Sequence, residues 1–129
     1  MTATWRWVSV HLAVNWHARL IERFGGLGGI RDVGLLEGAL ARPANLVAYG
    51  EGVTVEKLGA LYGVGVAKAH AFIDGNKRIA FAVMVAFLKA HRRVLDATET
   101  EATDIMLKVA AGEIGEEELE GWLVQRCRE

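Results

Sequence analysis

The sequence predicts an all-α fold, a compact bundle of about six helices with a buried central helix. Apolar residues recur at helical spacing along most of the chain, and strand-like alternation is nearly absent. Capping residues and glycines mark where successive helices begin and end. The chain has 129 residues, a usual length for one domain with one hydrophobic core. We therefore expect residues 1–129 to form a single domain.

The first expected helix runs from Ser9, a residue type that favours the N-cap position, to Phe24. It ends in GGLGG, residues 25–29, because glycine readily adopts the left-handed conformations that terminate helices. One face of this helix carries apolar side chains at four-residue spacing: Leu12, Trp16, Leu20 and Phe24.

A short second helix is expected to begin after Asp32, which can cap it, and to end at Pro43, the only proline. Its apolar side chains are Leu35, Leu36, Ala39 and Leu40. The segment Asn45–Gly52 is then expected to be an irregular loop, and residues 47–55 to supply at most a short extended piece.

Thr54 is suited to cap a third helix that ends near His70, and a fourth runs from around Gly75 to about His91. The fourth helix is apolar on nearly all sides, so we expect it at the centre of the fold. Its apolar run, Ile79–Leu88, is much shorter than the roughly 20 residues that span a membrane.

The C-terminal part of the chain predicts two more helices. Thr98 and Glu101 have the spacing of a capping box that opens a fifth helix. The acidic run at 116–118 favours the start of a sixth, because carboxylates offset the positive end of the helix dipole. Between the fourth and fifth helices, Arg93–Leu95 is expected to form a short extended piece.

Composition limits the classes of function. The net charge of −1 argues against nucleic acid as a direct partner. The N-terminal segment is interrupted by Arg6, His11 and Asn15, so it lacks the apolar centre of a signal peptide. A single cysteine, Cys127, excludes an intrachain disulfide and fits a reducing compartment. We expect a cytoplasmic protein without a membrane anchor.

Two glycine-rich stretches and a histidine pair are only weak signals of a nucleotide-binding or metal site. GGLGG is not followed by the Gly-Lys-Ser/Thr of a P-loop, and GVGVAK at 63–68 has no preceding strand. Both are interpreted as helix ends or helix-packing points. His11 and His17 are six residues apart and do not share a helix face, which argues against a metal pair.

The segment HAFIDGNKR, residues 70–78, gathers polar side chains between the third and fourth helices. A helix N-terminus presents unpaired backbone N–H groups and the positive end of the dipole, which together bind anions. Gly75 leaves those groups accessible, and Asn76 can brace the loop with side-chain hydrogen bonds. Lys77 and Arg78 add two positive charges, and arginine can bind phosphate oxygens bidentately.

Two further side chains complete a site for phosphoryl or nucleotidyl transfer. Asp74 is a hard oxygen ligand suited to a magnesium ion that bridges phosphates. His70 has the ring chemistry to accept a proton from an incoming hydroxyl. The alternative is a charged loop with a stray histidine, but so many specified residues at fixed spacing favour a functional site.

HAFIDGNKR resembles the signature of the Fic/Doc family, H-x-F-x-(D/N)-(G/A)-N-(K/G)-R, in its Doc branch. Residues 23–40, RFGGLGGIRDVGLLEGAL, and residues 110–123, AAGEIGEEELEGWL, are similar to the corresponding segments of Doc toxins. The resemblance implies a toxin with a cognate antitoxin of the Phd type. It also implies an enzyme that uses ATP and Mg²⁺ to phosphorylate a threonine of elongation factor Tu and so halts translation.

The same resemblance implies a role for each residue of the motif. His70 would be the general base for the target hydroxyl, and Asp74 would hold magnesium. The nucleotide phosphates would be bound by Gly75, Asn76, Lys77 and Arg78.

Lys77 decides between two activities. Typical Fic enzymes, which transfer AMP, have glycine at this position and a second arginine three residues after the first. Here Lys77 replaces that glycine, and Phe81 stands where the second arginine would be. The resemblance to Doc proteins then implies a reversed nucleotide with its γ-phosphate facing the base, and therefore a kinase. A Fic-like AMP transferase and a catalytically silent module that binds an antitoxin are the alternatives.

Overall fold

The computed structural model of the protein describes residues 4–50 and 52–129. Within these residues, two short strands, β1 (Val94–Leu95) and β2 (Cys127–Arg128), pair in antiparallel fashion. The all-α prediction is confirmed, and so is the extended piece at β1. The six helices of the described residues are α1 (Val10–Phe24), α2 (Val33–Tyr49), α3 (Val55–Ala69), α4 (Asn76–Ala90), α5 (Glu99–Ala110) and α6 (Glu116–Arg126).

Local side-chain caps fix four of the helix starts, as the sequence predicted. In each case a side-chain oxygen accepts a hydrogen bond from the backbone N–H three residues further on. Each such cap contributes about 1 kcal/mol to the stability of the helix. Glu101 also accepts the backbone N–H of Thr98 at 3.0 Å and so completes the predicted capping box. The capping residues are Ser9, Asp32, Thr54 and Thr98.

The second helix is longer than predicted, because α2 continues through Pro43 to Tyr49. The loop expected at Asn45–Gly52 is therefore wrong at residues 45–49, which are helical, whereas Gly50 and Gly52 lie between the helices as expected. The described residues of 47–55 form no strand, and Glu51 lies outside the described residues. Pro43 is buried together with Leu36 and Leu40, on the helix that packs against α3. Burial of this apolar face offsets the roughly 3 kcal/mol that a proline costs inside a helix.

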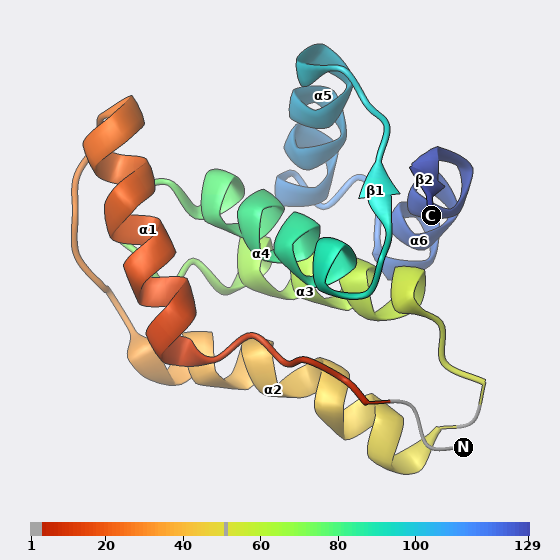
Figure 1. Cartoon of the computed structure of the whole chain (residues 1–129). Helices are drawn as coiled ribbons and strands as arrows, with labels where there is room; N and C mark the ends of the chain where they lie inside the picture. Colours follow the sequence, from red (N-terminus) through yellow and green to blue (C-terminus); the bar gives the residue numbers. More distant parts are fainter. Residues whose placement is uncertain (1–3, 51) are drawn as a thin grey trace.

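The centre of the bundle is formed by α3 and α4, which lie side by side (Figure 1). The predicted central helix, α4, is buried along one face and shares the centre with α3, which packs against α2, α4, α5 and α6. A Cβ atom added at Gly63 on α3 would lie 2.9 Å from the sulfur of Met84 on α4. This close contact confirms that GVGVAK is a helix-packing stretch. Among the described residues, no helix is long and apolar enough to cross a membrane.

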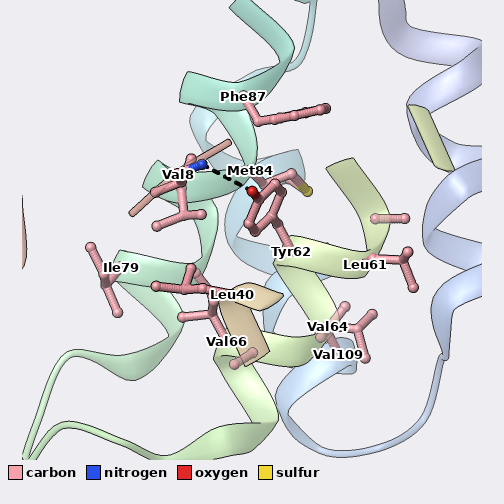
Figure 2. Packing of buried hydrophobic residues seen from close by; sticks show 14 of the residues in the cluster. Val8, Leu40, Leu61, Tyr62, Val64, Val66, Ile79, Met84, Phe87 and Val109 are labelled. Carbon is pink, nitrogen blue, oxygen red and sulfur yellow. Dashed lines mark hydrogen bonds between the residues drawn. The ribbon is translucent and has the colours of Figure 1, made fainter. Parts of the chain in front are cut away.

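Tyr62 links the N-terminal segment to this core. Its ring is fully buried, and its hydroxyl accepts a hydrogen bond from the backbone N–H of Val8 at 3.0 Å (Figure 2). Burial raises the pKa of Tyr62, so the phenol remains neutral at physiological pH. The hydrogen bond satisfies a backbone N–H that is itself shielded from water.

Replacing Tyr62 by phenylalanine is expected to lower the free energy of unfolding by about 1–3 kcal/mol, because the N–H of Val8 would lose its acceptor. Urea unfolding followed by circular dichroism measures the change. Tyr49→Phe is the matched control, since Tyr49 is 93% exposed and its change should be below about 0.5 kcal/mol. Equal losses in the two variants would contradict the assigned role of the buried hydroxyl.

Candidate functional site

The predicted site, residues 70–78, forms the turn between α3 and α4. His70 follows the last residue of α3 in the left-handed conformation, with a φ of 47°. Gly75 has a φ of 74° directly before α4, a conformation that glycine adopts without a Cβ penalty. Phe72 is buried and anchors the turn in the core. The side chains that the turn leaves exposed include His70, Asp74, Lys77 and Arg78.

The linker between α1 and α2, residues 25–32, lies against this turn. The N–H of Ile73 donates to the carbonyl of Gly29 at 3.2 Å, and the N–H of Arg31 donates to the carbonyl of Ala71 at 2.7 Å. An isolated antiparallel bridge pairs Ile30 with Phe72. The glycine-rich linker therefore does more than end α1, because it supplies the backbone partners of the candidate site.

Backbone N–H groups hold the Asp74 carboxylate in place. The N–H of Leu27 donates to Oδ2 at 3.1 Å, and the N–H of Gly75 donates to Oδ1 at 2.8 Å. These two bonds hold the pKa of Asp74 below its usual range, and the nearby charge of Arg78 makes a smaller contribution in the same direction. Asp74 is therefore ionised at neutral pH.

The donor chemistry of Asp74 fits the magnesium role implied for it. The described residues hold no group of three or more His, Cys, Asp or Glu side chains arranged around one point. Proteins commonly bind Mg²⁺ through one or two carboxylates together with substrate phosphates. A carboxylate that accepts two backbone hydrogen bonds still has lone pairs for a metal ion, so Asp74 can serve as such a ligand.

The first turn of α4 is the candidate phosphate-binding element. No side chain caps this N-terminus, so the backbone N–H groups of Asn76, Lys77 and Arg78 lack a side-chain acceptor there. Lys77 and Arg78 lie in the same turn and are exposed. The guanidinium of Arg78 lies over the ring of Phe24, 4.4 Å from its centroid, and this contact restricts the orientation of the arginine.

Asn76 braces the turn, as the sequence predicted. Its Oδ1 accepts the N–H of Phe72 at 3.1 Å, and its Nδ2 donates to the carbonyl of Phe72 at 3.0 Å. Both polar groups of the side chain are thus used within the protein.

Sequence reasoning missed two side chains that contact the turn. His17 on α1 is buried, its Nε2 lies 2.7 Å from the carbonyl oxygen of Asp74, and its ring stacks on that of Phe72. Arg31 donates from Nε to the carbonyl of His70 at 2.7 Å. Neither residue belongs to the 70–78 motif, so the motif did not indicate them.

The buried face of α1 also differs from the one that the apolar spacing indicated. The buried residues of α1 are Ala13 and His17. The predicted apolar stripe is only partly covered, since Leu12 is 39% exposed and Phe24 is 55% exposed. The available signal for His17 was its place as a polar residue midway along an amphipathic helix. From the sequence it was considered only as a metal partner of His11, and their separation of six residues argued against that role.

Replacing Gly26 by alanine is expected to disturb Asp74, because the new Cβ would lie 2.8 Å from Oδ2 and the φ at this position is 115°. The expected loss is about 1–3 kcal/mol of unfolding free energy, measured by urea unfolding at pH 7. Gly28→Ala in the same linker is the control, since its Cβ would meet open space, and it should change stability by less than about 0.5 kcal/mol. Similar losses of unfolding free energy in both variants would show that the loss arises from replacing any glycine of the linker, and not from the contact with Asp74.

The lowered pKa of Asp74 predicts how its contribution to stability depends on pH. The contribution is complete above the unfolded pKa of about 3.9 and is lost as the pH falls through the lower folded value. The loss of stability in Asp74→Asn should therefore be present at pH 7 and shrink in acid. Urea unfolding across this pH range measures it, with Asp104→Asn on the exposed surface of α5 as the control. A loss independent of pH would contradict the assignment.

A family model described as the Fic/DOC family matches residues 7–88, which include the turn. The chain is 34% identical over 110 residues to the protein kinase doc of Escherichia phage P1, covering 84% of this chain and 86% of that protein. It is 39% identical over 92 residues to toxin Doc of Mycolicibacterium smegmatis, covering 67% and 69% respectively. The chain therefore belongs to the Fic/Doc family, and these relatives place it in the Doc branch.

Proposed function

We propose that the protein is a Doc-type toxin and a protein kinase that transfers the γ-phosphate of ATP to a Ser/Thr hydroxyl of a translation protein. Elongation factor Tu is the expected target, and its modification would halt translation. The observation that carries the proposal is the turn at 70–78, where an ionised carboxylate and two exposed cations adjoin an uncapped helix N-terminus. Similarity to a protein named as a kinase supports phosphate transfer.

The proposed mechanism divides the reaction among the residues of the turn. The target hydroxyl gives its proton to His70 while its oxygen attacks the γ-phosphorus, and the bond from that phosphorus to the bridging oxygen of ADP breaks. The backbone N–H groups of Gly75 and Asn76 belong to the proposed phosphate cradle, although that of Gly75 donates to Asp74 in the structure described here. Lys77 and Arg78 supply the positive charge.

Magnesium would be held by Asp74 together with the phosphates, where it neutralises charge on the nucleotide. The remaining catalysis is mainly positioning, since phosphoryl transfer asks for little covalent chemistry from the protein. The fixed orientation of the Asp74 carboxylate supports this role, because neither of its oxygens depends on a flexible side chain for support.

Two neighbouring positions favour phosphate over AMP as the transferred group. Lys77 lies in the first turn of α4 and is exposed, so its charge is available to a phosphate. Phe81, at the position of the second arginine of AMP-transferring Fic enzymes, packs partly buried against the core. It brings no positive charge to the site. An AMP transferase is the second candidate, and a silent binding module is the third.

The toxin relatives imply an antitoxin partner, and we propose one of the Phd type that inhibits the enzyme in the cytoplasm. We further propose that residues 1–129 act as one domain. The hydrophobic cluster supports this, because its buried members extend from Val8 to Leu123.

A double-label experiment tests the transferred group. The protein is incubated with bacterial lysate and ATP labelled at either the γ- or the α-phosphate, and label from the γ-phosphate alone is expected on protein. His70→Ala should lower transfer by about 100-fold or more and relieve growth arrest on expression. His11→Ala, which alters an exposed histidine of α1, is the control and should retain activity.

Each of the other outcomes points to another function. Label from the α-phosphate would identify an AMP transferase and exclude the kinase. Absence of label with both nucleotides, unchanged in His70→Ala, would favour the silent binding module. Growth arrest that persists in His70→Ala would show that toxicity does not arise from this site.

A further inference from the structure

We propose that His17 is a positioning residue of this site. From α1, outside the 70–78 motif, it fixes the peptide between Asp74 and Gly75 and thereby sets the geometry of the metal-binding carboxylate and of the α4 N-terminus. The inference rests on the function proposed above, because it concerns how that site binds phosphates and magnesium. His17 itself contacts neither the proposed base nor the cations of α4 through any described hydrogen bond.

The first observation is a buried hydrogen bond. His17 is 3% exposed, and its Nε2 lies 2.7 Å from the carbonyl oxygen of Asp74. A carbonyl oxygen can only accept, so Nε2 must carry the hydrogen and donate it. Loss of this donor would leave the carbonyl without a partner beside a buried ring, which is costly.

The second observation is that the other side of the same peptide is also held. The N–H of Gly75 donates to Oδ1 of Asp74 at 2.8 Å. The carbonyl of the Asp74–Gly75 peptide is thus bound by His17, and its N–H is bound by the carboxylate. Rotation of this peptide would break both bonds, move the carboxylate and redirect the backbone that leads into α4.

The third observation fixes the imidazole ring itself. It stacks on the ring of Phe72, with 3.8 Å between centroids and an interplanar angle of 14°. The backbone of Phe72 is in turn bound by the side chain of Asn76. A Cβ added at Gly75 would lie 3.6 Å from Nε2 of His17, so α1 packs closely against the start of α4. His17 therefore lies at the contact between α1, the turn and α4.

A pair of substitutions tests the role. Glutamine can place an amide N–H donor near the position of Nε2, whereas leucine fills similar space without a donor. The readouts are the Kd of Mg²⁺–ADP by calorimetry and the kcat and KM for ATP in the γ-label assay. His17→Leu should weaken Mg²⁺–ADP binding by about 10-fold or more, a typical effect of losing a residue that orients a metal ligand. His17→Gln should restore binding to within about 3-fold of the unaltered protein.

Tyr62→Phe is the matched control for stability, because it weakens the core at a different buried hydrogen bond. It should leave the Kd of Mg²⁺–ADP unchanged. Where the unaltered protein binds Mg²⁺–ADP, the inference is overturned if His17→Leu binds it equally well, if His17→Gln is as impaired as His17→Leu, or if Tyr62→Phe weakens binding equally.

A measurement without nucleotide separates this inference from the proposed function. The imidazole ¹⁵N shifts of His17 should show hydrogen on Nε2, and the amide shifts that change in His17→Leu should cluster at residues 72–78 and at Leu27. If these results are obtained and the unaltered protein binds no Mg²⁺–ADP, the proposed function fails while the positioning of the turn is supported. A ring with hydrogen on Nδ1 alone, or shift changes spread through α1 and α4, would overturn the inference.

Discussion

The candidate site depends on the pairing between the side chain of Asn76 and the backbone of Phe72. Phe72 is buried, so both polar groups of its backbone need partners within the protein. Asparagine carries a donor and an acceptor in one short amide and satisfies both at 3.0 and 3.1 Å. This pairing closes the turn between α3 and α4 while Phe72 anchors it. The exposed side chains of the turn therefore project from a backbone that is fixed at its centre.

The linker between α1 and α2 provides a second set of hydrogen bonds that fix the turn. Its backbone binds the turn at Ala71 and Ile73 and donates the N–H of Leu27 to Asp74. Gly26 has a positive φ and lies too close to the Asp74 carboxylate for any Cβ atom. Gly26 is thus required by the approach of the Asp74 side chain to the linker, whereas Gly28 is not, because its Cβ would meet open space. Folding of the N-terminal part of the chain against the turn is a condition for the geometry of the site.

The parts of the fold that could be predicted are those set by nearby residues. Caps such as Thr98 act within one helical turn, and the 70–78 motif is contiguous, so both can be read from the sequence. The end of α2 could not be predicted, because burial of Pro43 against α3 outweighs a local rule. His17 lies 57 residues from the carbonyl that it binds, and no local pattern indicates a contact at that distance.

The charges of the site explain why the proposed function includes a divalent cation. Two exposed cations and an uncapped helix N-terminus attract phosphate, yet the ionised carboxylate of Asp74 lies at the same helix end and repels it. Backbone N–H groups, and not Lys77 or Arg78, form the hydrogen bonds to that carboxylate in the described residues. The cations therefore remain available to an anion. A magnesium ion held by Asp74 together with the phosphates would convert the repulsion into binding, so the carboxylate and the proposed phosphate cradle would act together.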